Sequence, residues 1–150
     1  MVLEYKPSTL IGYSVGGMTT IYHQKLHPNP LIKKLIILGP PSELSGIIKD
    51  YQKTLGLSDR FMKSWNMYFK ENFGMYYDEF SIAKFSKTVQ QKGLIIHDKQ
   101  DAIAPYSASV AIHKNWANSK LVSTDGLGHS LYHSSVENSM IDFLKTRILS

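Results

Sequence analysis

Hydrophobic residues along the chain gather into short runs that longer amphipathic stretches separate. Four runs of β-branched and aliphatic residues predict buried strands, at residues 8–13, 34–38, 93–97 and 120–124. None of them alternates cleanly between polar and apolar positions, which is typical of strands in a parallel sheet covered on both faces. The pattern therefore predicts a sheet of about four parallel strands.

The stretches between these runs predict the crossover helices that parallel strands require. Residues 15–26 form an amphipathic stretch that ends at a His-Pro-Asn-Pro stop signal. Residues 105–116 begin with a proline, which suits a first helical turn, and residues 136–149 place apolar side chains on one face. This alternation of strands and helices predicts an α/β fold.

The segment at residues 39–92 is longer than a crossover needs and is rich in aromatic residues. Its pattern predicts three helices, at residues 42–55, 58–72 and 77–90. Ser42 and Ser58 are the predicted N-caps, and Gly56 and Gly74 are the predicted stops. The aromatic side chains are typical of a helix–helix core, and as a group they could also form an apolar wall over a substrate site.

The composition is that of a globular protein with one domain. The chain has 150 residues, of which 43% are hydrophobic and 19% are charged. Cysteine is absent, which rules out disulfides, thiolate metal sites and a cysteine nucleophile. No apolar run approaches the roughly 20 residues of a membrane span, and the first residues do not resemble a secretory signal. We therefore expect a cytoplasmic protein.

The net charge of +5 raises the question of nucleic-acid binding. The lysines, however, are scattered among acidic residues and form no basic block with interleaved aromatic residues, so we expect a solvated surface and no nucleic-acid partner. Two histidine pairs have a spacing of four, His23 with His27 and His129 with His133. Neither pair has the glutamate of an H-E-x-x-H motif or a third ligand, so we expect no metal.

The motif that carries chemistry is G-x-S-x-G at residues 12–16, where the first predicted strand meets the first helix. A serine in so sharp a turn has strained backbone geometry, and Gly12 and Gly16 are expected to avoid side-chain collisions around it. Ser14 would then stand above the sheet edge, with the N–H group of Val15 able to bind an oxyanion. The alternative, a glycine-rich turn that cradles a phosphate, lacks the G-x-G-x-x-G and G-K-[ST] spacings.

A serine nucleophile needs a base, and the base needs an orienting acid. Asp98 and Asp101 follow the third predicted strand, and Asp125 and His129 follow the fourth. The carboxyl ends of parallel strands meet at the edge where α/β sheets place their sites. These residues are therefore candidates for the acid and the base.

Three motifs together resemble the α/β-hydrolase superfamily. They are G-Y-S-V-G-G at residues 12–17, I-I-H-D-x-x-D-x-x-x-P at residues 95–105 and G-x-G-H-S at residues 126–130. The resemblance implies that Ser14 is the nucleophile, Asp101 the acid and His129 the base, with no cofactor. Asp98 is then interpreted as a surface or loop-capping residue and Asp125 as a turn former.

The resemblance covers the later part of the family's domain. Residues 1–150 would be a single domain of partial α/β-hydrolase fold that lacks the usual N-terminal strands, with a helical cap insertion at residues 39–92. The loop that normally gives the second oxyanion donor would also be missing, and residues 1–6 resemble the end of the helix before the nucleophile strand. Leu10 and Ile11 would lie on an exposed sheet edge. The chain is then interpreted as a shortened enzyme, a chain that pairs through this edge, for example as a homodimer, or a half-sheet with poor catalysis.

The expected function is hydrolysis of a carboxylic ester or thioester of a small molecule through an acyl-enzyme. Activity should rise between about pH 6 and 7, because the base must be unprotonated. C–C bond hydrolysis and acyl transfer, which occur in the superfamily, remain open. The contrasting hypothesis is a catalytically impaired fragment or a non-enzymatic interaction module of the same fold.

Overall fold

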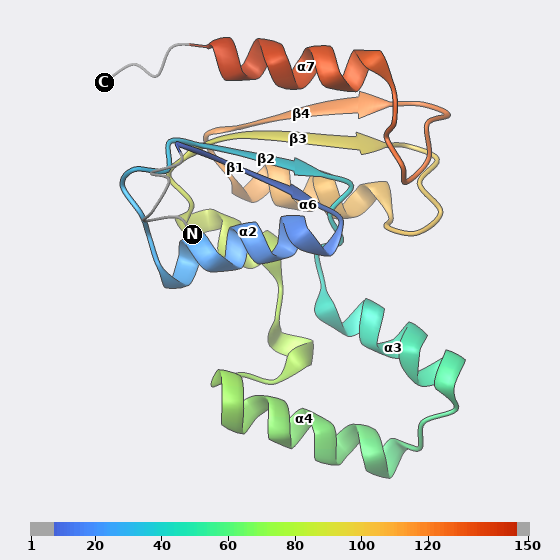
Figure 1. The fold of residues 1–150 in the computed structure, drawn as a ribbon. Helices are drawn as coiled ribbons and strands as arrows, with labels where there is room; N and C mark the ends of the chain where they lie inside the picture. The colour runs from blue at the N-terminus through green and yellow to red at the C-terminus, as the bar shows by residue number, and fades with distance from the viewer. Residues whose placement is uncertain (1–7, 147–150) are drawn as a thin grey trace. The chain divides into compact units, whose positions relative to one another are not determined.

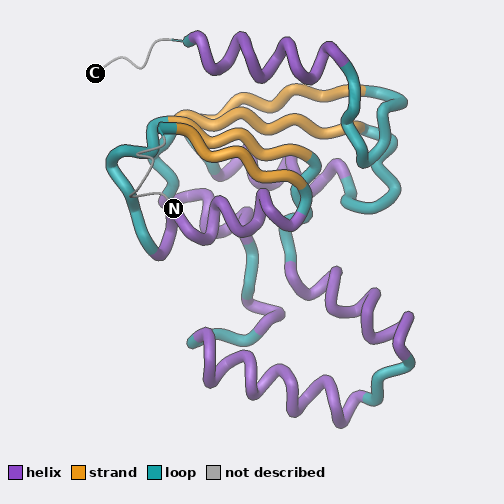
Figure 2. The backbone as a smooth tube through the Cα atoms, viewed as in Figure 1, coloured by secondary structure: helices purple, strands orange, loops and turns teal. Residues whose placement is uncertain are grey.

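The computed structural model describes residues 8–146, and its centre is one parallel sheet. The strands are β1 (Thr9–Tyr13), β2 (Lys34–Leu38), β3 (Lys92–Asp98) and β4 (Ser119–Thr124). They lie side by side in the order β1-β2-β3-β4, and each neighbouring pair is parallel (Figures 1 and 2). The prediction of an α/β fold with four parallel strands is confirmed. All four carboxyl ends therefore meet at one edge of the sheet.

Helices cover both faces of this sheet. Figure 1 shows α2 (Val15–Leu26) and α6 (Tyr106–Asn115) on one side and α7 (Ser134–Lys145) on the other. The middle strands are consequently buried, which explains why their sequences do not alternate between polar and apolar residues. Helix α7 begins two residues before the predicted start, and its predicted end at residue 149 lies outside the described residues.

One core cluster lies where α7 meets the sheet. It contains Ile36, Leu94, Ile96, Leu131 and Val136, all of them buried. Burying a side chain of this size contributes about 1.5–3 kcal/mol to folding. This cluster therefore holds the loop before α7 against the strands.

A buried lysine ties the end of α7 to the beginning of β2. The Nζ group of Lys34 donates hydrogen bonds to the carbonyl oxygens of Phe143, Leu144 and Thr146, at 3.0, 2.6 and 2.7 Å. The last carbonyl groups of a helix have no partner within the helix and carry partial negative charge, so a cation there is stabilising. Lys34 thus fixes one end of α7.

Residues 43–81 form a second compact unit. It contains α3 (Leu44–Leu55), α4 (Asp59–Phe73) and the short 3₁₀ helix η1 (Tyr77–Glu79). The Ser58 side chain caps α4 by accepting from the N–H group of Phe61, and Gly56 and Gly74 end the two α-helices in the left-handed conformation. These three predictions are confirmed. The reading of residues 39–92 as a cap stays a prediction.

The predicted N-cap at Ser42 is wrong, because α3 begins one residue later, after Glu43. Glu43 pairs with Ser81 in an antiparallel bridge, and the Ser81 hydroxyl donates to the Glu43 carboxylate at 2.6 Å. Both strands of a bridge must be extended, so the chain can turn into a helix only after residue 43.

The same bridge breaks the helix predicted at residues 77–90. The segment contains η1, then α5 (Ile82–Phe85) and η2 (Ser86–Thr88), with the extended Ser81 between η1 and α5. Helix α5 packs against α2 and α6. A bridge partner 38 residues away in the chain overrides the local helical pattern.

The aromatic residues of the segment fall into two groups. Phe80 and Phe85 are buried, as a core interpretation predicts, whereas several others are about half exposed: Tyr51, Phe61, Tyr68 and Phe73. The core interpretation therefore accounts for only some of them. The apolar wall over a substrate site stays a prediction.

Strand β1 lies at an edge of the sheet. About half of the Ile11 side chain is exposed, and Leu10 is partly buried. The exposed apolar edge was predicted from the sequence, whereas its pairing with a second copy stays a prediction. Of the helices within residues 8–146, none has the length and apolar character to cross a bilayer.

Candidate active site

Ser14 occupies the turn between β1 and α2 in a backbone conformation that is rare for a residue with a side chain. Its φ is 52° and its ψ is −123°. Backbone hydrogen bonds hold the turn, because the Ser14 N–H group donates to the carbonyl of Leu38 at the end of β2 at 2.8 Å and Gly17 N–H donates to the carbonyl of Ser14 at 2.9 Å. The hydroxyl is thereby presented at the carboxyl edge of the sheet.

The two glycines of the motif are not equivalent. A Cβ atom at Gly12 would lie 2.6 Å from the backbone carbonyl carbon of Gly16 and 2.6 Å from the Thr20 hydroxyl, so no side chain fits there. A Cβ atom at Gly16 would meet no atom within 4 Å. The prediction that both glycines avoid a collision is therefore wrong for Gly16, whose side of the helix is open.

The three residues expected to form a triad come together at this edge. The Nε2 atom of His129 lies 3.0 Å from the Ser14 hydroxyl, and Nδ1 lies 2.7 Å from the Oδ2 atom of Asp101. Since a carboxylate only accepts hydrogen bonds, the proton is on Nδ1, and Nε2 accepts from the serine. The Asp101 side chain is fully buried, and that of His129 is 18% exposed.

Backbone groups hold Asp101 from the other side. Its Oδ1 atom accepts from the N–H groups of Ile103 and Ala104 at 2.8 and 2.9 Å. Burial by itself raises the pKa of Asp101, but the bonds from Ala104, His129 and Ile103 and the charge of the His129 ring outweigh it and hold the pKa below its ordinary value. Asp125 is not part of this arrangement, because its carboxylate accepts from the Gln100 side chain.

The loop that carries His129 is fitted closely to the nucleophile strand. Gly126 and Gly128 have positive φ angles of 85° and 62°, which only glycine adopts readily. The Tyr13 hydroxyl donates to the backbone carbonyl of His129 at 2.9 Å, and the two rings lie 5.2 Å apart. Tyr13 therefore holds His129 in place, which its position between the glycine and the serine of the motif did not indicate.

Asp98 is fully buried, so its interpretation as a surface residue is wrong and only the loop-capping part is correct. Its Oδ2 atom accepts from the Thr124 hydroxyl at 2.7 Å and the Leu127 N–H group at 2.9 Å, and Oδ1 accepts from Gln100 N–H at 2.8 Å. Burial raises the pKa of Asp98, but these bonds outweigh it and lower the pKa from 3.8 to about 2. Asp98 thus joins the loop that carries Asp101 to the loop that carries His129.

We expect Asp98→Asn to lower the free energy of unfolding by about 2–3 kcal/mol at pH 7. The amide would turn an N–H donor toward the N–H group of Leu127 or Gln100, which leaves buried groups unpaired. Because the folded pKa lies below the unfolded one, the stabilisation by Asp98 is complete above about pH 4 and disappears as the pH falls toward 2. Urea unfolding of both proteins across that range measures this, and an unchanged difference between pH 7 and 2 would contradict it.

Gly39, which directly follows β2, lies against the acid and the base. Its φ is 52°, and a Cβ atom there would be 3.4 Å from Nδ1 of His129 and 3.5 Å from Oδ2 of Asp101. The end of β2 therefore forms a wall beside this pair. Sequence reasoning missed Gly39, although a glycine between a strand and two prolines is a signal for an unusual backbone conformation.

The N–H group of Val15 is the first of helix α2 and adjoins Ser14. The first N–H groups of a helix have no acceptor within the helix, and the helix dipole adds partial positive charge there. This position can therefore stabilise a negative charge that develops beside Ser14.

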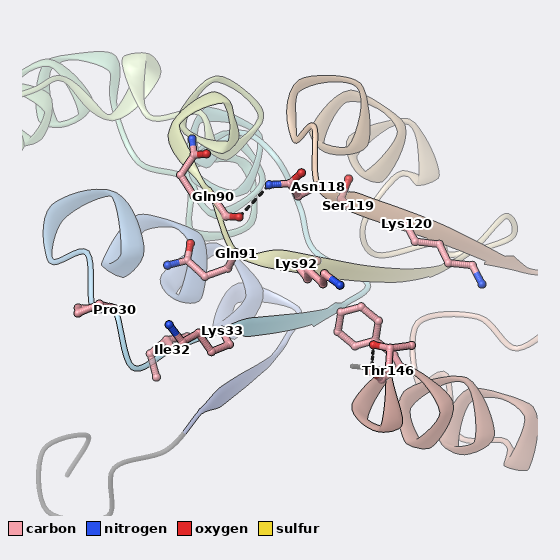
Figure 3. Close-up of a pocket in the computed structure, with 12 residues that line it drawn as sticks. Pro30, Ile32, Lys33, Gln90, Gln91, Lys92, Asn118, Ser119, Lys120 and Thr146 are labelled. Atoms are coloured by element: carbon pink, nitrogen blue, oxygen red, sulfur yellow. Dashed lines mark hydrogen bonds between the residues drawn. The ribbon is translucent and has the colours of Figure 1, made fainter. Parts of the chain in front are cut away.

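One cavity of the structure lies away from Ser14, Asp101 and His129. Figure 3 shows a cavity of about 690 Å³ lined by residues at the beginning of strands β2, β3 and β4, among them Lys33, Lys92 and Lys120. Ser14, Asp101 and His129 follow the opposite, carboxyl ends of β1, β3 and β4. The cavity and the candidate active site therefore lie at opposite edges of the sheet.

Metal ligands do not gather at this edge. Within residues 8–146, no group of three or more histidine, aspartate or glutamate side chains is arranged to hold a metal ion. The rings of His23, on α2, and His27, directly after it, lie 5.6 Å apart without a third ligand in that part of the structure.

Comparison with known proteins gives one family match. A family model described as a TAP-like protein matches residues 78–149, which include Asp101 and His129 but not Ser14. A search of curated proteins finds no match.

Solved structures share the fold of this chain. The esterase domain of a Rhodothermus marinus protein is 16% identical with a TM-score of 0.62, and the match covers 92% of this chain and 57% of that one. A bromoperoxidase from Bacillus anthracis is 22% identical with a TM-score of 0.65, covering 97% and 70%. An esterase from Exiguobacterium antarcticum is 17% identical with a TM-score of 0.66, covering 97% and 70%. This chain thus spans 57% of the first of these proteins.

Proposed function

We propose that this chain is a member of the α/β-hydrolase superfamily and acts as a serine hydrolase of carboxylic esters or thioesters. The observation that carries the proposal is the continuous path of hydrogen bonds from the Ser14 hydroxyl through His129 to Asp101, with distances of 3.0 and 2.7 Å. A hydroxyl, an imidazole and a buried carboxylate in this order are the groups that acyl transfer needs.

In the proposed reaction, Ser14 attacks the carbonyl carbon of the ester while its proton moves to Nε2 of His129. Asp101 stabilises the imidazolium that forms, and the N–H group of Val15 binds the oxyanion. His129 returns the proton to the leaving alcohol or thiol, which leaves an acyl group on Ser14. A water molecule activated by the same imidazole then releases the acid, and no cofactor takes part.

A fluorophosphonate probe tests the proposal directly. We expect stoichiometric labelling of the folded protein and complete loss of the label in Ser14→Ala. Ser64→Ala, which changes an exposed serine on α4, is the matched control and should label like the wild type. Labelling that does not depend on Ser14, or no labelling of a folded protein, would contradict the proposal.

Hydrolysis of 4-nitrophenyl esters of different acyl length then distinguishes a site that turns over substrate from one that has its side chains in place but does not. We expect release of 4-nitrophenol that continues beyond one equivalent per protein. A burst of one equivalent, or labelling by the probe without turnover, would instead support the catalytically impaired fragment.

A further inference from the structure

A second imidazole contacts the acid of the proposed triad. The Oδ2 atom of Asp101 accepts from Nδ1 of His129 at 2.7 Å, and the Nε2 atom of His97 lies 3.1 Å from the same oxygen. His97 is in the last part of β3, four residues before Asp101, and its side chain is fully buried. Neither the proposed reaction nor the motif assigns it a role.

The surroundings of His97 determine which of its ring nitrogens carries the proton. Nε2 faces only acceptors, namely Oδ2 of Asp101 and the carbonyl of Ala104 at 2.9 Å, so Nε2 is the protonated atom. Nδ1 lies 2.6 Å from the Ser109 hydroxyl and accepts its hydrogen. Since His97 and Ser109 are both fully buried, these bonds are required to satisfy their polar groups.

We propose that His97 is a positioning residue that, through its hydrogen bond to Ala104 and its contact with Oδ2, holds the Asp101 carboxylate in the direction from which it accepts the His129 proton. The inference rests on the proposed function. Two backbone N–H groups already hold Oδ1, and Nε2 of His97 lies against Oδ2 at 3.1 Å while its hydrogen bond goes to the Ala104 carbonyl. The carboxylate is thereby in place before His129 becomes charged, which is the condition for electrostatic stabilisation without reorganisation.

The bond from His97 to Ala104 supports the same role. It joins the end of β3 to the residue that closes the loop around Asp101, because the N–H group of Ala104 also donates to Oδ1. The buried imidazole thus contacts both the carboxylate and the backbone that holds it.

Two amide substitutions separate positioning from a structural role. In His97→Gln the terminal nitrogen lies where Nε2 was, so it can still donate to the Ala104 carbonyl beside Asp101, whereas in His97→Asn the nitrogen lies where Nδ1 was and faces Ser109. We expect kcat within about threefold of the wild type for His97→Gln and roughly tenfold to a hundredfold lower for His97→Asn, with KM changed less than about twofold in both. Equal kcat values for the two variants would overturn the proposal.

Ile95→Val is the matched control, because residue 95 is buried on the same face of β3 two positions earlier and loses only one methylene group. It should lose stability and keep kcat. If it lowers kcat as His97→Asn does, general destabilisation explains the effect and the proposal fails.

Proton NMR decides the question even if no ester is turned over. The downfield resonance of the Nδ1 proton shared by His129 and Asp101 should shift or broaden in His97→Asn and remain in His97→Gln and Ile95→Val. An unchanged resonance in His97→Asn would refute positioning by His97. Absence of Ser14-dependent labelling in the wild type would refute the proposed function alone, since the resonance does not require turnover.

Discussion

Asp101→Asn is expected to lower kcat roughly ten-thousand-fold while the protein stays folded. The amide oxygen will take the place of Oδ1, where it accepts from the N–H groups of Ile103 and Ala104. The amide nitrogen then faces Nδ1 of His129, which has to accept a hydrogen bond there. The proton of His129 moves to Nε2, and the ring can no longer accept the proton of Ser14.

Steady-state hydrolysis of a 4-nitrophenyl ester and the rate of fluorophosphonate labelling both measure this loss. Asp125→Asn is the control, because Asp125 is an exposed carboxylate at the same edge that contacts Gln100 and not His129. Its kcat should stay within about twofold of the wild type, as is usual for surface substitutions away from a site. A loss of less than about tenfold in Asp101→Asn would show that Asp101 does not act as the acid.

Gly12→Ala is expected to lower the free energy of unfolding by more than about 3 kcal/mol, whereas Gly16→Ala should raise it by about 0.5–1 kcal/mol. The new methyl group at position 12 would collide with the backbone of the first turn of α2, which no side-chain rotation can relieve. The methyl group at position 16 points into open space on an exposed helical residue, where alanine is the better helix former.

Urea unfolding followed by circular dichroism measures both changes in stability. Each variant is the control for the other, because both replace a glycine of the same turn by alanine. The Gly12→Ala variant could fail to fold altogether. Loss of soluble Gly12→Ala protein, while Gly16→Ala stays soluble and folded, would be the largest form of the expected effect. Equal stabilities of the two variants would contradict the packing at the turn.

The sequence predicted those features that depend on local pattern. The four apolar runs correspond to strands because the buried positions of a parallel sheet need no polar alternation. The stops at Gly56 and Gly74 and the cap at Ser58 were predictable because caps are local in sequence. The meeting of Ser14, Asp101 and His129 was foreseen only through three motifs that resemble a known family.

The features that the sequence did not reveal depend on contacts between distant residues. The helix predicted at residues 77–90 is interrupted because Ser81 pairs with Glu43, and nothing near residue 81 signals that partner. Asp98 looked like a surface residue because two of the three groups that donate to it come from the next strand and loop. His97 is a polar residue at the end of the apolar run of β3, which was a signal in the sequence. Its contacts with Asp101 and Ser109, however, can be seen only in the folded chain.

Ser14 and His129, the proposed nucleophile and base, are 115 residues apart in the chain and follow the first and last strands of the sheet. During synthesis, Ser14 leaves the ribosome long before residue 129 exists, and until then its hydroxyl has no base and is no more reactive than that of free serine. Nascent and half-folded forms of the protein are therefore chemically inert. Catalytic activity would arise only late in folding, when the loop that carries His129 packs beside the turn that carries Ser14.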